Sequence, residues 1–198
     1  RAKDRDLRPL FFPILQGSVF PHLRKRAGEM AIGLSPDGIC IGGMAVGEPK
    51  ELLWDTLAAT TAGLPEDRPR YLMGVGAPED LWEAVERGVD MLDCVFPTRV
   101  GRNGTALVRD GRLNIKTARF RTDPNPLDPD CGCFVCKRYS RAYLCHLMRS
   151  EELSALRFLS YHNVHYLMDL MKQIRAAIPA GRFAQEKAAF FDRIKAAA

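Results

Sequence analysis

The sequence predicts an α/β fold with a parallel sheet of about four βα units, followed by a mostly helical subdomain that binds a metal. Two observations lead to this prediction. Between residues 10 and 98, short β-rich runs alternate with helical patterns, and strands separated by single helices form right-handed βαβ units. Three cysteines then occur within residues 131–136, a spacing that suits metal binding better than a disulfide framework.

The four expected strands are short apolar runs that are bounded by turn residues. They cover residues 10–15, 38–42, 71–75 and 91–96. Pro97 is expected to end the last of them, because proline cannot donate to a strand ladder. Both faces of these runs are apolar, so they fit a parallel sheet that is covered on each side.

The helices expected after the first three strands are marked by amphipathic spacing or by helix-starting residues. They span 21–32, which stops at Gly33, and then 50–62 and 78–88. In parallel α/β sheets, ligand groups gather at the carboxyl ends of the strands. We therefore expect the functional groups of this half in Gln16, 42–48, 73–76 and 93–102.

A β-hairpin is expected where the α/β pattern ends. Residues 105–108 and 113–116 flank Arg109-Asp-Gly-Arg112, and an Asp-Gly pair between two apolar runs is typical of a tight hairpin turn. We place the domain boundary just before this hairpin. Residues 1–104 are then the α/β domain, and residues 105–198 hold the hairpin, the metal site and the C-terminal helices.

Helical periodicity covers the last part of the chain, from residue 140 to residue 194. Breaks are expected near Glu151, near Asn163 and at 179–181, where glycine, proline or short polar residues interrupt the pattern. The subdomain is therefore expected to be mostly helical.

Composition and charge exclude several classes of protein. The chain has 198 residues, of which 46% are hydrophobic and 27% charged, which argues against disordered and fibrous proteins. No apolar run approaches the roughly 20 residues of a membrane span, and charged residues 1–8 do not resemble a signal peptide, so we expect no membrane partner and a cytoplasmic location. The net charge of +5 is compatible with a polyanionic partner such as nucleic acid. Because residue 1 is Arg, we expect the sequence to begin within a longer chain.

The cysteine cluster predicts a zinc site. Cys131, Cys133 and Cys136 place three thiols in one turn-like segment, and zinc takes such sulfurs at about 2.3 Å around a tetrahedron. Four residues are candidates for the fourth ligand: Cys145, His146, His162 and His165. A closed site would be structural, whereas a catalytic zinc keeps a position for water. For each histidine the alternative is a surface or core role.

Asp93 is the strongest candidate for chemistry. It lies at the carboxyl end of the last expected strand, where a carboxylate packs poorly but could serve as a nucleophile, a base or a cation ligand. A helix cap or an ion pair is the alternative. Glu48 closes the glycine-rich loop 42–48, whose backbone could approach a flat ligand or simply turn tightly. Arg99 and Arg102 could contact phosphate or form a solvated face.

Several motifs occur together and in the order of a known family. They are Gln16-Gly-Ser18, Gly42-Gly-Met-Ala-Val-Gly-Glu48, Tyr71-Leu-Met-Gly-Val-Gly76, Asp93-Cys-Val-Phe-Pro-Thr-Arg99, Gly101-Arg-Asn-Gly104, Cys131-x-Cys133-x-x-Cys136 and Tyr161-His-Asn163. The sequence resembles the tRNA-guanine transglycosylases, the queuine and archaeosine tRNA-ribosyltransferase family, over nearly its whole length. This resemblance implies an eight-stranded (β/α) TIM barrel. The chain supplies about four of its βα units, so we expect it to be the second, carboxyl-terminal half of the barrel with the zinc subdomain.

The resemblance also implies an activity. Members exchange the wobble guanine of tRNA anticodons for a deazaguanine base, through a covalent bond between an aspartate and the ribose. Val46 is similar to the bacterial pattern, which implies 7-aminomethyl-7-deazaguanine as the incoming base, in queuosine biosynthesis. It further implies one structural zinc per chain and a homodimer formed through the zinc subdomain.

Site residues follow from the same resemblance. Asp93 matches the nucleophile. The residues that match the base-binding groups are Gln16, Gly43, Met44, Ala45, Glu48 and Met73. Those that match the RNA contacts are Thr98, Arg99 and Arg102. Those that match the zinc ligands are Cys131, Cys133, Cys136 and His162.

Three other functions remain open at this point. The chain could be a non-catalytic RNA-binding or partner subunit of the same fold, or an inactive fragment that lacks the amino-terminal half. It could also be an unrelated zinc-containing hydrolase, which would need an open metal site. The presence of Asp93, Gln16 and Glu48 together favours the enzyme.

Overall fold

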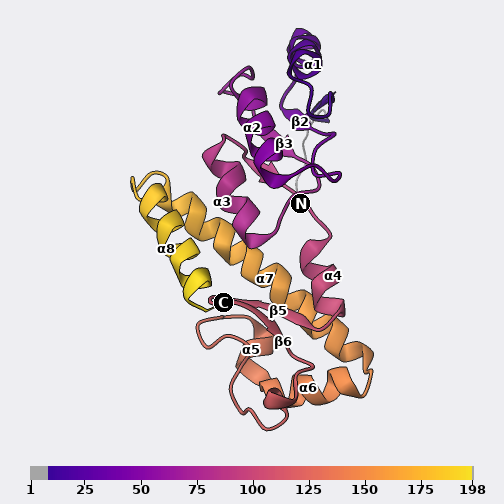
Figure 1. Cartoon of the computed structure of the whole chain (residues 1–198), viewed down its shortest axis with the longest axis vertical. Coiled ribbons are helices and arrows are strands. Elements are labelled where there is room, and N and C mark those ends of the chain that lie inside the picture. Colours follow the sequence, from indigo (N-terminus) through magenta and orange to yellow (C-terminus); the bar gives the residue numbers. More distant parts are fainter. Residues whose placement is uncertain (1–8, 198) are drawn as a thin grey trace, which may run out of the picture. The chain divides into compact units, whose positions relative to one another are not determined.

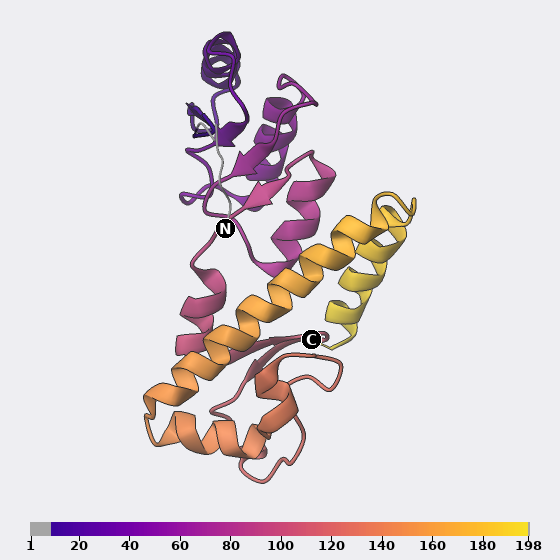
Figure 2. The same ribbon diagram turned by 180° about the vertical axis from the view of Figure 1, so that it is seen from behind.

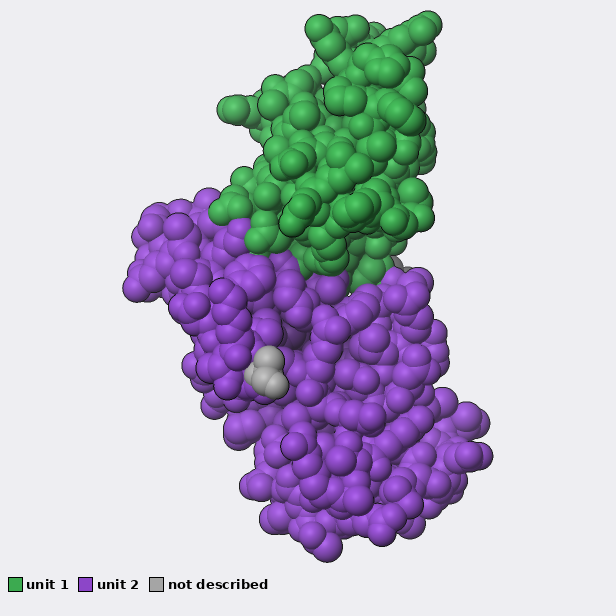
Figure 3. Space-filling view, in the orientation of Figure 1, with its two compact units in different colours: residues 1–76, 80–94 green, residues 77–79, 95–198 purple. Residues whose placement is uncertain are grey.

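A computed structural model describes residues 9–197 of the chain, and Figures 1 and 2 show its ribbon from two sides. The described residues divide into two compact units (Figure 3). The first comprises the chain up to residue 76 together with residues 80–94, and the second comprises residues 77–79 and the chain from residue 95 onward. No helix within 9–197 is long and apolar enough to cross a membrane.

The first unit contains a four-stranded parallel sheet, as the sequence predicts. The strands lie side by side in the order in which they occur in the chain: β1 (Ile14–Leu15), β2 (Ile39–Ile41), β3 (Arg70–Leu72) and β4 (Met91–Leu92). A helix follows each of the first three strands, namely α1 (Pro21–Gly33), α2 (Lys50–Thr61) and α3 (Pro78–Glu86). Two parallel neighbouring strands need such a crossover connection between them. The alternation of strands and helices along the chain therefore agrees with the parallel sheet.

The core of this unit lies between the sheet and its helices. The side chains of Ile39, Ile41 and Leu72 on the two central strands are fully buried, and Leu57 of α2 packs into the same cluster. Each buried aliphatic side chain of this size contributes about 1.5–3 kcal/mol to stability. Burial of the central strands explains why they read as continuous apolar runs.

The two outer strands are shorter than expected. The strand expected over 10–15 forms only at Ile14–Leu15, and the one expected over 91–96 forms only at Met91–Leu92. Residues Phe96–Arg102 form the helix α4 instead. Pro97 lies in the first turn of α4, where its missing N–H leaves no hydrogen bond unmade, so it helps to start a helix and is not the residue that stops the strand.

The second unit begins with α4 and the predicted β-hairpin. Its strands are β5 (Thr105–Val108) and β6 (Gly111–Asn114), which pair antiparallel. Gly111 pairs with Val108, so the turn is Arg109-Asp110 and the second strand begins two residues earlier than expected. Gly111 has a φ of +122°, which an L side chain rarely adopts, and this explains why glycine stands at that point.

Helices make up most of the remainder of the second unit, in agreement with the sequence. They are η1 (Ala118–Phe120), α5 (Phe134–Arg138), α6 (Arg141–Arg149), α7 (Leu153–Ala177) and α8 (Phe183–Ala196). Figure 2 shows the long helix α7 with α8 folded back beside it. The core of this unit joins the hairpin, the cysteine segment, α6 and α7, and includes Ile115, Leu127, Val135, Leu144 and Leu159.

Helix α7 is continuous at Asn163, so the break expected there is wrong. The Asn163 side chain is fully buried and does not compete for the backbone of its own helix. Its Oδ1 accepts from the Leu107 N–H at 2.8 Å, and its Nδ2 donates to the carbonyls of Pro97 and Thr105 at 2.9 Å each. Asn163 therefore ties α7 to α4 and to β5.

We expect Asn163→Ala to lower the free energy of unfolding by about 3 kcal/mol, because it removes three long-range hydrogen bonds, two of them buried. Urea denaturation of the second unit measures the change. Gln173→Ala is the control, since this amide lies exposed on the same helix. Equal stability of the two variants would show that the three hydrogen bonds contribute little.

Candidate functional site

The candidate site lies at the carboxyl ends of the parallel strands. Gln16 directly follows β1, the loop 42–48 follows β2, Met73 follows β3, and Asp93 follows β4. Because parallel neighbours end at the same edge of a sheet, the structure brings these predicted residues to one edge of the first unit.

Asp93 is exposed, and one of its two carboxylate oxygens is anchored. Its Oδ1 accepts hydrogen bonds from the Tyr71 hydroxyl at 2.8 Å and from the Gly74 N–H at 3.1 Å. Within residues 9–197 its Oδ2 accepts none. The hydrogen bond to Asp93 is the main cause that raises the pKa of Tyr71, so Tyr71 stays protonated and donates. The carboxylate is thus held through one oxygen and presents the other for chemistry.

Tyr71 is a functional candidate that our sequence reasoning missed, whereas Gly74 was expected only as part of the segment 73–76. Tyr71 is the register partner of Met91, and Asp93 lies two residues beyond Met91, on the same face of its strand. A tyrosine at this register can therefore reach the carboxylate at the end of the next strand. Gly74 has a φ of +79°, which turns the chain sharply after β3, and its N–H meets the same oxygen. The parallel register was the signal that could have identified Tyr71.

Glu48 folds back onto the loop that it closes. Its Oε1 accepts from the Ala45 N–H at 2.5 Å, and its Oε2 accepts from the Val46 N–H at 3.0 Å. Burial works to raise the pKa of Glu48, but the backbone N–H groups of its own loop outweigh burial, and the pKa is lowered. Ala45 has a φ of +59°, an unusual value for a residue with a side chain. Glu48 is therefore a charged carboxylate that holds a strained loop in place.

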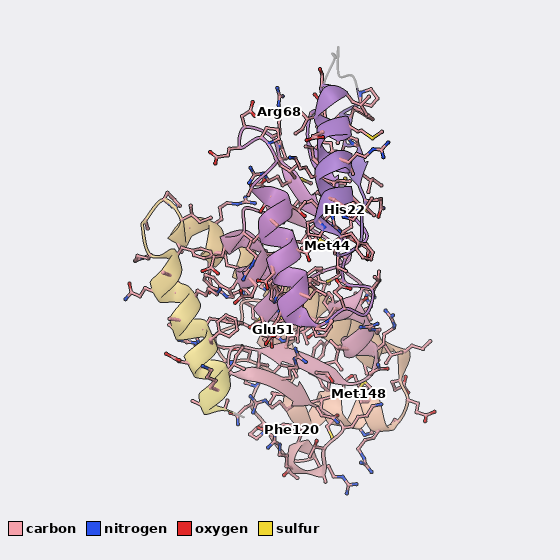
Figure 4. All side chains as sticks on the ribbon, turned by 45° about the horizontal axis from the view of Figure 1, so that its top comes forward. His22, Met44, Glu51, Arg68, Phe120 and Met148 are labelled. Atoms are coloured by element: carbon pink, nitrogen blue, oxygen red, sulfur yellow. The ribbon has the colours of Figure 1, made fainter. Side chains whose placement is uncertain are left out.

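Gln16 packs on the two glycines that begin this loop. A Cβ on Gly43 would lie 2.5 Å from the Gln16 Oε1, and one on Gly42 would lie 2.8 Å from its Nε2. Only glycine leaves room for the amide at these positions. Met44 is buried in the core of the unit (Figure 4), so its backbone and not its side chain is available for binding. Met73 is half-buried beyond β3.

The predicted RNA contacts lie on α4, in the second unit. Arg99 and Arg102 occupy its last turn and are exposed, as a role in phosphate binding requires. The Thr98 hydroxyl donates to the Val95 carbonyl at 3.2 Å, one turn earlier in the chain.

The predicted metal site is assembled in the second unit. One ligand atom from each of Cys131, Cys133, Cys136 and His162 lies within 4.8 Å of the others. The His162 Nδ1 is 3.7, 3.5 and 3.3 Å from the sulfur atoms of these three cysteines in the same order. Three thiols and one imidazole in a closed cluster are the donor set of structural zinc, so these residues fit that metal.

The second nitrogen of His162 fixes the orientation of the ring. Its Nε2 donates to the Leu107 carbonyl at 2.7 Å, which leaves the Nδ1 as the nitrogen that faces the cysteines. Burial works to lower the pKa of His162, but the neighbouring sulfurs of Cys131 and Cys133 raise it to about 9. The His162 ring is therefore positively charged beside the cysteine sulfurs, and a divalent cation can take the place of this positive charge.

Local structure explains how the cysteine segment is shaped. Cys131 donates its N–H to the Asp128 carbonyl at 3.2 Å, which closes the turn before the cluster. Cys133 caps the N-terminus of α5, where its sulfur accepts from the Cys136 N–H at 3.4 Å. Hydrogen bonds from the other two thiols lower the pKa of Cys133 far below its ordinary value. The segment thus favours a thiolate before any metal binds.

The other candidates for the fourth ligand lie outside the cluster. Cys145 is buried, and its thiol donates to the Thr117 carbonyl at 3.8 Å, while His146 is exposed. The His165 Nδ1 lies 3.8 Å from the Cys131 sulfur, but it also lies 3.1 Å from the Asp169 Oδ2. The geometry therefore selects His162 among the four.

Comparison with known proteins gives one family. Residues 1–196 match the family described as "Queuine tRNA-ribosyltransferase". The chain is 48% identical over 196 residues to the queuine tRNA-ribosyltransferase of Symbiobacterium thermophilum, covering 98% of the chain and 49% of the relative. It is 46% identical over 193 residues to that of Bacillus mycoides, covering 98% of the chain and 51% of the relative. It is 48% identical over 184 residues to that of Pelotomaculum thermopropionicum, covering 93% of the chain and 50% of the relative. The chain spans about half the length of the curated relatives that it matches.

Proposed function

The chain belongs to the queuine tRNA-ribosyltransferase family, and from this premise we propose that it carries the nucleophile of a tRNA-guanine transglycosylase. The reaction exchanges the wobble guanine of a tRNA anticodon for 7-aminomethyl-7-deazaguanine. The observation that supports this best is the Asp93 carboxylate, which is held by Tyr71 and Gly74 through one oxygen at the edge where the base-binding residues gather.

The proposed chemistry is a double displacement. Asp93 Oδ2 attacks the anomeric carbon of the ribose, the bond to N9 of guanine breaks, and guanine leaves with its bonding electrons and takes up a proton. The resulting ester joins Asp93 to the RNA. The incoming base then loses a proton, its ring nitrogen attacks the same carbon, and the carboxylate is released. Two inversions retain the configuration, as in retaining glycosidases.

Base recognition is assigned to the loops after β1, β2 and β3. We propose that Gln16, Gly43 and the backbone of Met44 and Ala45 bind the polar edge of the purine, and that Met73 packs on its plane. Glu48 would recognise the aminomethyl group. Its lowered pKa supports this role, because a carboxylate that is charged at neutral pH attracts the ammonium of the incoming base.

Thr98, Arg99 and Arg102 are assigned to the RNA backbone and bases around the target nucleotide. The exposure of both arginines in the last turn of α4 supports this assignment. We propose that zinc occupies the cluster of three cysteines and His162 with a structural role, one ion per chain, and that two chains associate through the zinc subdomain.

The parallel sheet is proposed to be half of a (β/α)8 barrel. Residues 1–104 would carry the second half of the barrel, and residues 105–198 the hairpin, the zinc site and the C-terminal helices. Two facts support this: the strands follow one another in sheet order, and the chain spans about half of the relatives it matches.

Exchange of labelled guanine into unmodified tRNA tests the function. The assay uses this chain, with zinc content determined on the same sample and an intact relative as positive control. Incorporation of label into tRNA is the expected result. Tight tRNA binding without exchange would instead favour a partner subunit, and absence of both would overturn the proposal for this chain.

Tyr71→Phe is expected to lower the kcat of exchange roughly 10- to 100-fold, because it removes one of the two donors that hold the Asp93 carboxylate. The KM for tRNA should change little. Steady-state kinetics measure both constants. Tyr161→Phe is the control, since it removes a hydroxyl from an exposed tyrosine of the second unit. An unchanged kcat in Tyr71→Phe would show that Gly74 alone is sufficient.

A further inference from the structure

A buried arginine joins the two loops that are assigned to base recognition. Arg24 lies in the first turns of α1, and only 3% of its surface is exposed. Its Nε donates to the Ser18 carbonyl at 2.5 Å, in the turn after β1. Its Nη2 donates to the carbonyls of Gly42 at 2.9 Å and Gly43 at 3.3 Å, at the start of the loop after β2. One guanidinium therefore links both loops.

Close packing leaves the loops little freedom around this side chain. A Cβ on Gly17 would lie 2.8 Å from the Arg24 backbone nitrogen and 2.9 Å from its Cγ, so the turn after β1 rests directly on α1. The Gln16 amide in turn fills the space beside Gly43. A movement of Arg24 would therefore displace Gln16 and the loop after β2 together.

Burial of the charged Arg24 side chain carries two energetic penalties. Burial lowers the pKa of Arg24, and the charge of Glu48 opposes that effect. Its Nη1 is buried and has no acceptor within residues 9–197, and an unsatisfied buried donor destabilises a protein. An apolar side chain would avoid both penalties, but it would leave the carbonyls of Ser18, Gly42 and Gly43 without this donor, so the guanidinium acts through these three carbonyls.

That role follows from the peptide groups it binds. The Gly42 carbonyl belongs to the same peptide as the Gly43 N–H, and the Gly43 carbonyl to the same peptide as the Met44 N–H. A cation on a carbonyl oxygen polarises its peptide and strengthens the N–H as a donor. Within residues 9–197 neither of these N–H groups donates a hydrogen bond. Both are thus available to a ligand that carries an acceptor.

We propose that Arg24 is a positioning residue for base recognition, which fixes the loops after β1 and β2 and strengthens the Gly43 and Met44 N–H groups as donors to the carbonyl oxygen of a guanine-type base. This inference rests on the proposed function, and it adds a residue that does not touch the base. Arg24 acts through the carbonyls of Ser18, Gly42 and Gly43. Selectivity for bases with that carbonyl oxygen is its consequence.

Equilibrium binding of two bases to the chain tests the proposal. Guanine carries the 6-carbonyl oxygen, and 2-aminopurine lacks it. We expect Arg24→Met to weaken guanine binding at least about 10-fold and 2-aminopurine binding less than about 3-fold, since one lost charge-assisted interaction accounts for a factor of this size. Arg24→Lys keeps the charge without the planar fork, so its affinity for guanine should lie between those of wild type and Arg24→Met. Lys25→Met is the control, because Lys25 is the exposed neighbour on the same helix.

The outcomes separate this proposal from the proposed function. If Arg24→Met weakens the binding of both bases equally, or binds them as Lys25→Met does, the proposed role of Arg24 is overturned. The proposed function is not affected by either result. A wild-type chain that binds no guanine would overturn both. Circular dichroism reports whether each variant folds. If Arg24→Met does not fold, the ratio of guanine to 2-aminopurine affinity in Arg24→Lys decides: a lower ratio than in wild type supports the proposal, and an unchanged ratio overturns it.

Discussion

Asp93→Asn is expected to abolish the covalent RNA adduct and to lower guanine exchange roughly 10,000-fold or more. An amide has nearly the shape of a carboxylate, so the hydrogen bonds from Tyr71 and Gly74 can still be made, but it does not form the ester with ribose. Denaturing gel electrophoresis of the chain after incubation with tRNA detects the adduct, and the exchange assay gives the rate.

Two further measurements on the same variant distinguish a chemical role from a structural one. Zinc content should not change, because Asp93 belongs to the first unit and the metal ligands to the second. The pKa of Tyr71 should fall, since the variant removes the negative charge of Asp93, which is one of the causes that raise it. Tyrosinate absorbance during a pH titration, with Tyr71→Phe as reference, reports that change. An Asp93→Asn variant that still forms the adduct would exclude Asp93 as the nucleophile.

The sequence predicted which residues meet at the sheet edge better than it predicted where the strands end. Strands separated by single helices favour a parallel sheet, so Gln16 and Asp93 were expected at one edge whatever the strand lengths were. Pro97 misled the prediction, because proline ends a strand as readily as it begins a helix. In the folded chain Pro97 begins the helix α4.

Long-range partners account for the rest of what was missed. Asn163 reads as a helix breaker in sequence, but its amide binds Leu107, Pro97 and Thr105, residues that are 56 or more positions away along the chain. Tyr71 has no local feature that marks it, and its importance depends on the register between β3 and β4. The same is true of Arg24, which reads as one charge of an amphipathic helix but lies buried against three carbonyls. The spacing of residues along the chain does not identify those that act through a distant partner.

Zinc removal is expected to have the largest effect on stability. His162 joins α7 to the cysteine segment through its Nδ1 and to β5 through its Nε2. Structural zinc sites supply on the order of 10 kcal/mol of folding free energy at neutral pH. Without the metal, the closely spaced sulfur atoms lose the cation that joins them to His162. Chelation, or Cys133→Ser, should therefore abolish the cooperative unfolding of the second unit, as measured by calorimetry. Acid should act in the same direction, because protonation of the sulfurs competes with the metal.

Cys145→Ser is the matched control for this prediction. Cys145 is a buried thiol of the same unit, but it binds the Thr117 carbonyl and lies outside the metal cluster, so the variant should keep one zinc and cooperative unfolding. Loss of zinc from Cys145→Ser and retention in Cys133→Ser would contradict the ligand assignment. The first unit has a hydrophobic core of its own, and Tyr71 and Asp93 both belong to this unit. The raised pKa of Tyr71 should therefore persist after chelation, which would show that the metal stabilises the subdomain and takes no part in holding the nucleophile.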